Sequence, residues 1–232
     1  MVLAQLEIWH SRPIAPTRRI ALGHLVLPAD PVPGFGGVLL GAVLAAHAPQ
    51  LDDDVTVDVR RLIGEVARDE RVVQPRLRHR FQVDRHGLMI STHQMVRDGD
   101  SVRFDIATTG TPLQHVLGAV YAVERLDQRV RPQLAPLLER AMSWRGPLGS
   151  PFISFMAGTK ATNVSAVADP RAWALDVLGF PGGTLKVTKK DVMSRYRQSL
   201  RMAHPDHGGD DETAHRLIDD ITEARRVLLE SL

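Results

Sequence analysis

Residues 188–209 read TKKDVMSRYRQSLRMAHPDHGG, and this stretch decides the fold of the carboxy-terminal part of the chain. Thr188 and Asp191 have the Thr-x-x-acid spacing of a capping box, which predicts that a helix begins here and runs to about Ala203. The apolar side of this helix consists of Val192, Tyr196, Leu200 and Ala203. The opposite side is basic and consists of Lys190, Arg197 and Arg201. The pattern predicts an amphipathic helix with one buried side and one exposed, basic side.

A short helix is expected before this one. Asp169 is a capping residue, Pro170 suits the first helical position, and Gly179 is typical of the residue that follows a helix. We therefore predict a helix over Pro170–Leu178 that exposes Trp173 and buries Val177 or Leu178.

A third helix is expected after the glycine and aspartate residues at 208–211, because acidic residues favour the positive end of a helix dipole. It should end near Leu229. Its apolar stripe consists of Ala214, Leu217, Ile218, Ile221, Ala224 and Leu228. Two amphipathic helices joined by a short loop predict an antiparallel hairpin, with the short helix closing one side.

The hairpin loop contains the tripeptide His204-Pro205-Asp206. A tripeptide of this kind, between a basic helix and an acidic-apolar helix, resembles the J domain of DnaJ-type co-chaperones. The resemblance covers residues 169–232. It implies that His204, Pro205 and Asp206 stimulate ATP hydrolysis by a DnaK-type chaperone. The basic residues of the preceding helix would dock on that partner, and we add Tyr196 to the candidate partner-binding residues.

Charge is segregated across this hairpin, although the whole chain is almost neutral, with 29 Lys+Arg against 27 Asp+Glu. Residues 186–204 carry six basic groups and one acid, a net of +5. Residues 206–230 carry three basic groups and eight acids, a net of −5. This segregation favours an acidic protein partner for the first hairpin helix.

The chain has no cysteine, which excludes disulfides, thiolate zinc sites and cysteine nucleophiles. DnaJ-like proteins with an amino-terminal J domain carry a Gly/Phe-rich linker and a cysteine zinc module, so this chain departs from them. It is more similar to divergent J proteins, in which a J domain is joined to an unrelated specificity domain.

The first part of the chain predicts an α+β domain. Alternating residues suggest strands around Leu6–Ile8 and over Arg19–Leu27, and small apolar residues suggest a helix over Gly37–His47. A second helix is expected over Val55–Arg68. Three apolar runs between Phe81 and Ile106 predict a small antiparallel meander. Its second run places Leu88, Ile90 and Val96 on one face, and Asp98-Gly99 forms a hairpin turn before the third run. Helices around 116–121 and 134–141 should cover the sheet.

We therefore expect an α+β amino-terminal domain over 1–168, including a connector at 146–168, and a helical J domain over 169–232. The expected function is that of a co-chaperone, with the first domain selecting an unidentified protein client or a location. No catalytic residues, cofactor or metal site are predicted. Histidines at 204, 207 and 215 have poor spacing for a metal site, and His79, His86 and His93 do not share a strand face.

The alternative function is nucleic-acid binding by a basic cluster over Arg71–Arg85, with the J-like helices purely structural. This cluster lacks a clear series of aromatic stacking partners, so a charged strand edge is the simpler interpretation. A membrane partner is not favoured either, because the apolar run 32–48 contains a proline and is shorter than the roughly 20 residues of a span. The charged residues within 1–21 do not suggest a secretory leader, and we expect a cytoplasmic protein.

Overall fold

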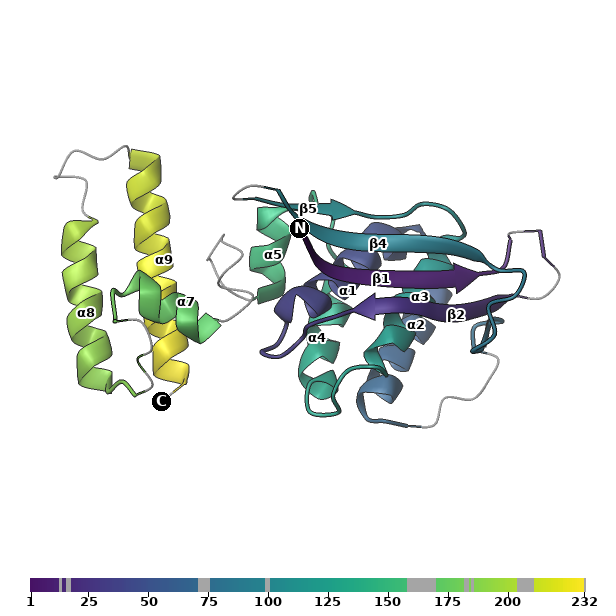
Figure 1. The fold of residues 1–232 in the computed structure, drawn as a ribbon, viewed down its shortest axis with the longest axis horizontal. Coiled ribbons are helices and arrows are strands. Elements are labelled where there is room, and N and C mark those ends of the chain that lie inside the picture. The colour runs from purple at the N-terminus through teal and green to yellow at the C-terminus, as the bar shows by residue number, and fades with distance from the viewer. Residues whose placement is uncertain are drawn as a thin grey trace. The chain divides into compact units, whose positions relative to one another are not determined.

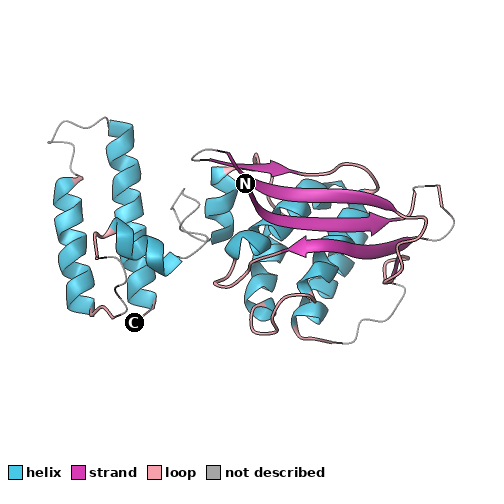
Figure 2. Ribbon diagram, in the orientation of Figure 1, coloured by secondary structure: helices cyan, strands magenta, loops and turns pink. Residues whose placement is uncertain are grey.

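The computed structural model describes residues 1–12, 14–15, 18–70, 76–98, 101–157, 170–181, 184, 186–203 and 211–231. The protein is a mixed α+β chain whose contacts form two compact units, Met1–Phe152 and Ile153–Leu232. The division falls inside the predicted connector. Figure 2 shows helices along the chain, and every strand of the described residues belongs to the first unit.

The first unit is built around a five-stranded sheet in the order β3-β2-β1-β4-β5. The strands are β1 (Val2–His10), β2 (Arg19–Val26), β3 (Arg80–Phe81), β4 (Met89–Asp98) and β5 (Ser101–Asp105). β1 pairs antiparallel with both β2 and β4, and β4 pairs antiparallel with β5. The two strands predicted at the start of the chain are therefore confirmed, and the first of them is the centre of the sheet.

Helices of the first unit cover one face of this sheet. They are α1 (Gly34–His47), the short 3₁₀ helix η1 (Ala48–Gln50), α2 (Asp53–Ala67), α3 (Pro112–Val123) and α4 (Arg131–Ala141). Leu6 and Ile8 of β1 are fully buried on the covered face. α3 approaches closely because Gly118 has no side chain: a Cβ there would lie 2.5 Å from Ile8 Cδ1. α1 and α3 pack on the strands, and α2 and α4 pack on those helices (Figure 1).

The apolar run that includes α1 is a buried helix of this unit, as its small residues predicted. Its neighbours surround it on all sides, so it has almost no polar face. Across the described residues, no helix combines the length and apolar character needed to cross a bilayer.

The predicted meander is wrong in two respects. β3 pairs in parallel with β2 and not with β4, and Val83 is 84% exposed. In β4 the buried face carries Ser91, His93 and Met95, whereas Ile90 is 45% exposed. The apolar alternation therefore pointed to the wrong face, because two of the inward residues are polar. Asp98 pairs with Ser101, so the connection is at 99–100, which lies outside the described residues.

The described part of the second unit contains α7 (Pro170–Val177), α8 (Lys189–Met202) and α9 (Asp211–Glu230), while α5 (Ser150–Ala157) spans the division between the units. α9 packs against both α7 and α8, and α8 and α9 run in opposite directions (Figure 1). Their core consists of Trp173, Ala174, Leu178, Val187, Val192, Ala203, Ile221, Ala224 and Leu228.

Two exposure predictions for these helices are wrong. Trp173 is only 4% exposed and belongs to the core, because α9 covers the side of α7 that carries it. Leu217 is 46% exposed, although it was assigned to the buried stripe of α9. The end of α7 is as predicted: Gly179 has a φ of 66°, and the backbone N–H of Phe180 donates to the Leu175 carbonyl at 2.8 Å. This is the hydrogen bond of a glycine-ended helix.

Candidate functional site

The amino-terminal end of α8 is fixed by the predicted capping box. The backbone N–H of Asp191 donates to Thr188 Oγ1 at 3.3 Å, and the backbone N–H of Thr188 donates to Asp191 Oδ2 at 3.1 Å. Hydrogen bonds from the Thr188 hydroxyl and backbone lower the pKa of the Asp191 carboxyl. The helix therefore begins at a defined residue, which sets the direction of every side chain on it.

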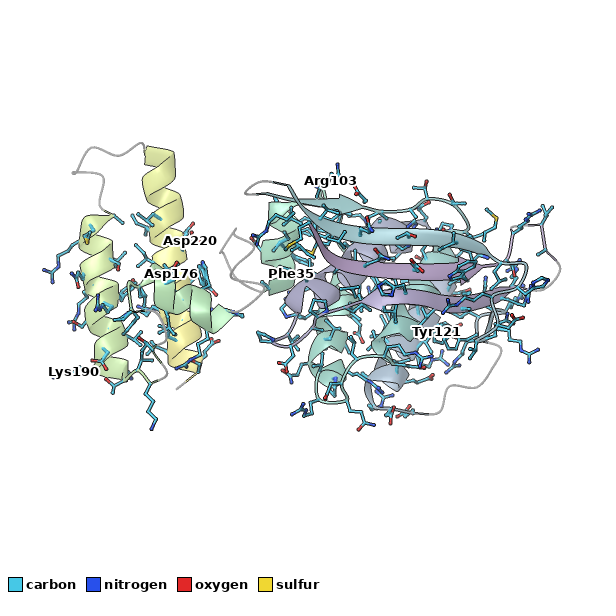
Figure 3. All side chains as sticks on the ribbon, viewed as in Figure 1. Phe35, Arg103, Tyr121, Asp176, Lys190 and Asp220 are labelled. Carbon is cyan, nitrogen blue, oxygen red and sulfur yellow. The ribbon has the colours of Figure 1, made fainter. Side chains whose placement is uncertain are left out.

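Lys190, Arg197 and Arg201 of α8 are exposed, as predicted. Lys190 lies in the first turn of the helix (Figure 3), and Arg197 and Arg201 follow along it. The Arg197 guanidinium donates to the Met193 carbonyl at 3.1 Å, a local bond on the helix surface. Three cations on one exposed side provide a surface that suits an acidic partner.

Tyr196 is placed differently from these cations. It is partly buried against the core of the second unit, and the Arg225 guanidinium lies 4.6 Å from the centre of its ring. The ring is therefore in a cation–π contact with α9. The candidate residues His204, Pro205 and Asp206 lie outside the described residues, between the end of α8 and the start of α9 in the sequence.

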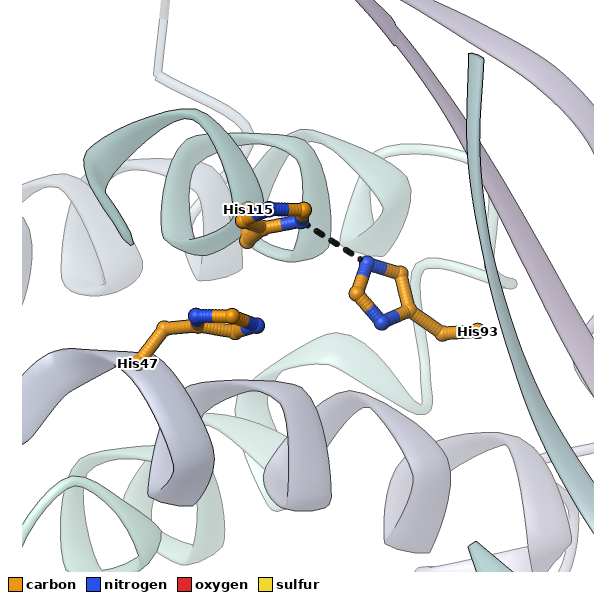
Figure 4. A group of neighbouring side chains, drawn as sticks. All are labelled: His47, His93 and His115. Carbon is orange, nitrogen blue, oxygen red and sulfur yellow. Dashed lines mark hydrogen bonds between the residues drawn. The ribbon is translucent and has the colours of Figure 1, made fainter. Parts of the chain in front are cut away.

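A second site, in the first unit, was not predicted. Three histidines from separate elements meet in its interior: His47 ends α1, His93 lies in β4, and His115 lies in the first turn of α3 (Figure 4). Their exposed fractions are 4%, 0% and 0%, respectively. One ring nitrogen from each lies within 4.8 Å of those of the other two. We call His47, His93 and His115 the histidine cluster.

The rings of the cluster have a defined arrangement. His47 and His115 are stacked, with centroids 4.1 Å apart and planes 13° from parallel. His93 is almost perpendicular to His115, at 87°. A fourth buried histidine, His10 at the end of β1, lies next to the cluster with its centroid 5.9 Å from that of His115. His10 Nε2 is 2.8 Å from the hydroxyl of Ser91.

Hydrogen bonds assign the tautomers in the cluster. The Ala107 backbone N–H donates to Nδ1 of His93 at 3.2 Å, so we assign the ring hydrogen of neutral His93 to Nε2. This group donates to Nδ1 of His115 at 3.0 Å. His47 Nε2 donates to the Ala107 carbonyl at 3.0 Å. The remaining ring nitrogen of His115, Nε2, is buried and makes no hydrogen bond of acceptable geometry.

Burial keeps these imidazoles neutral. Burial, together with a smaller effect of the neighbouring histidines, lowers the pKa of His93 to about 2 and that of His115 to about 3. The Thr109 carbonyl acts in the opposite direction on the pKa of His115. Burial also lowers the pKa of His47, and its bond to the Ala107 carbonyl opposes this shift. Imidazole in its neutral form is the commonest protein ligand of transition metals, so the cluster is chemically suited to bind a metal ion.

Sequence reasoning missed the cluster because its members are far apart in the chain. The histidines are 46 and 22 residues apart. One signal was available in the sequence. Ser91, His93 and Met95 are spaced two residues apart, which is the period of one strand face, although two of the three are polar. His79 is also buried, but it is not part of the cluster, and its Nδ1 lies 2.9 Å from the Leu77 carbonyl.

The basic cluster over Arg71–Arg85, which the alternative prediction assigns to nucleic-acid binding, makes several contacts within the first unit. Arg76 forms an ion pair with Glu65, and the Arg85 guanidinium lies 5.9 Å from the centre of the Trp9 ring system. Arg78 and Arg80 are exposed, and Arg71 lies outside the described residues. Arg76 and Arg78 also line a cavity of about 840 Å³.

No protein-family model matches this chain, and no curated protein or solved structure matches it either.

Proposed function

We propose that the protein is a J-domain co-chaperone, in which the second unit binds a DnaK-type chaperone and stimulates its ATP hydrolysis. The observation that carries this proposal is the exposed basic side of α8, immediately before His204, Pro205 and Asp206 in the sequence. The opposed helices α8 and α9 and their shared core support it, because they give the intervening loop two anchored ends.

In this proposal the protein has no catalytic residue of its own. Lys190, Arg197 and Arg201 attract and orient the acidic surface of the partner. Pro205 restricts the backbone of the loop, which reduces the entropy lost when His204 and Asp206 are bound. These contacts favour the ATP-hydrolysing state of the partner. For this to happen, the protein must bind that state more tightly than the partner's other state. The first unit would supply specificity for a client or a location, in the cytoplasm.

The test is single-turnover ATP hydrolysis by the DnaK-type chaperone of the same organism, with the full-length protein added. We expect the protein to accelerate hydrolysis and His204→Gln to remove the acceleration. His207→Gln is the matched control, because it changes a neighbouring histidine outside the tripeptide and should retain the acceleration. Circular dichroism spectra must agree among the three proteins.

Two results would contradict the proposal. One is a wild-type protein that accelerates none of the DnaK-type chaperones of its organism. The other is equal acceleration by wild type and His204→Gln, since the tripeptide would then have no role.

A further inference from the structure

We propose that the histidine cluster is a binding site for a late first-row transition-metal ion, with Zn²⁺ as the first candidate. This site lies within the first unit, and the proposal does not depend on the co-chaperone function. The three residues come from α1, β4 and α3, so the ion would join a helix, a central strand and a second helix of one core.

The chemistry of the donors selects the class of metal. The cluster offers three imidazoles and no carboxylate. Imidazole suits zinc, copper, nickel and iron, whereas magnesium and calcium require oxygen ligands. Three protein ligands leave the fourth position of a tetrahedral ion open to water or another small ligand. Catalytic zinc sites have this arrangement, whereas structural zinc sites have four protein ligands.

The distances are compatible with a shared ion. Two nitrogen ligands of one tetrahedral Zn²⁺, each bonded at about 2.0 Å, lie about 3.3 Å apart. His93 Nε2 and His115 Nδ1 are already 3.0 Å apart. The spread of the three nitrogens, up to 4.8 Å, must decrease by about 1.5 Å for all three to bind together. The proposal therefore requires the rings of the cluster to move closer together when the ion binds.

One ring nitrogen of the cluster has no hydrogen-bond partner among the described residues. Burial of three uncharged imidazoles is costly unless their polar atoms are satisfied, and the nitrogen Nε2 of His115 is not. An ion that binds between His93 and His115 displaces the hydrogen that they share, which leaves to solvent. Binding of a divalent ion then adds one positive charge to the core and not two.

Residues around the cluster limit the movement of its rings. The Ala107 peptide holds both His47 and His93, and His10 is held by the Ser91 hydroxyl. Ser91 in turn donates to the Thr109 carbonyl at 2.8 Å. The bond from His47 Nε2 to the Ala107 carbonyl is of the kind by which proteins orient ligating histidines, since such a histidine usually donates its other ring N–H to an acceptor.

The test uses the full-length protein without an affinity tag, stripped of metal with a chelator. Zn²⁺ is titrated in competition with a chromophoric chelator, and Co²⁺ is added separately to record the visible bands of a tetrahedral ion. We expect one ion per chain, a dissociation constant for Zn²⁺ below about 1 µM, and a higher melting temperature with Zn²⁺. His93→Asn should weaken binding by more than about 100-fold, beyond the 10- to 100-fold typical of outer contacts.

Matched controls separate this site from others. His79→Asn changes a buried histidine outside the cluster and should bind Zn²⁺ as the wild type does. The triple variant H204N/H207N/H215N removes the histidines near the hairpin loop and should also bind normally. Wild-type protein that binds no ion, or binding that is lost only in the triple variant, overturns the proposal.

A folding defect in His93→Asn would not leave the question open. Ring-nitrogen NMR spectra of the wild-type protein follow His47, His93 and His115 directly as Zn²⁺ is added. Changes confined to these rings and their neighbour His10 are expected. Unchanged ring signals at saturating Zn²⁺ would show that the cluster is a hydrogen-bonded core and not a metal site.

Discussion

Trp173 is an example of a single residue on which a small core depends. Its ring is 4% exposed and lies with Ala174 and Leu178 of the same segment and with the buried side of α9. The second unit has few large buried side chains among its described residues, so each one supplies a considerable share of the apolar area removed from water.

Replacement of Trp173 by alanine should therefore destabilise the second unit. Large-to-small changes of buried aromatic residues cost about 3–5 kcal/mol, through lost burial and the cavity that remains. Urea unfolding followed by far-ultraviolet circular dichroism measures the loss. Met202→Ala, at a residue that is 74% exposed, is the control and should change stability by less than about 0.5 kcal/mol. A similar effect of both variants would mean that Trp173 does not lie in the core.

At the scale of elements, α8 joins a local sequence signal to an exposed basic surface. The capping box fixes where the helix begins, and the helical period then places Val192 in the core and Arg197 and Arg201 in solvent. The start of the helix therefore contributes both to stability and to the direction of its basic side chains.

Thr188→Ala removes the side-chain acceptor at this start and should cost about 1 kcal/mol. Thermal or urea unfolding measures it. Ser194→Ala changes an exposed hydroxyl in the middle of the same helix and should be neutral or slightly stabilising, since alanine is the better helix former. Equal stability of Thr188→Ala and the wild type would argue against a contribution from the capping box.

The double variant R197E/R201E reverses two charges on the exposed side of α8. If this side docks on an acidic partner, association with the DnaK-type chaperone should slow by about 10-fold or more at low salt, and the difference should shrink as salt rises. Surface plasmon resonance at several salt concentrations measures both effects. Arg103→Glu, an exposed charge on β5, is the control. A rate that does not change with the double variant would remove α8 from the binding surface.

Helices were easier to predict than the sheet, for a physical reason. Helical signals are local: caps, glycine ends and a period of 3.6 residues located α8, α9 and the end of α7 at Gly179. Strand pairing is not local. The parallel contact of β3 with β2 joins residues about 60 positions apart, and no local pattern encodes it. The face of β4 was misassigned because its inward residues include His93, a polar residue that a rule based on apolar alternation counts as exposed.

At the scale of the whole molecule, the two compact units differ in the residues that they bury. The core of the second unit is mainly apolar, whereas the first unit buries the histidine cluster between α1, β4 and α3. The candidate residues of α8 were accessible to sequence analysis because they lie on one helix. The histidine cluster was not, because only the tertiary fold brings its members together.

The buried histidines should make the first unit sensitive to acid. Their pKa values are lowered in the folded state, so below the ordinary value of 6.5 the unfolded chain binds more protons than the folded one, and stability falls as pH falls. Between pH 7.5 and 5.5 His93 and His115 each contribute about 1.4 kcal/mol of lost stability, or about 3 kcal/mol together, and His47 adds to the loss in the same direction. Urea unfolding of the chelator-treated protein across this range measures the loss.

Two variants test the source of this pH dependence. His115→Asn removes one of the three groups and should reduce the loss of stability over this range by about 1.4 kcal/mol. His24→Asn changes an exposed histidine and should leave it unchanged. Stability that is constant from pH 7.5 to 5.5 would contradict burial of the cluster in its neutral form.

The peptide group of Ala107 contacts the cluster on two sides, through its N–H to His93 and its carbonyl to His47. Because the backbone makes both bonds, the methyl group of Ala107 takes no part in them. Evolutionary drift could replace residue 107 with almost any amino acid and preserve both bonds, with proline as the exception because it has no N–H. Relatives of this protein should then be recognised by histidines equivalent to positions 47, 93 and 115, while the side chain at position 107 varies.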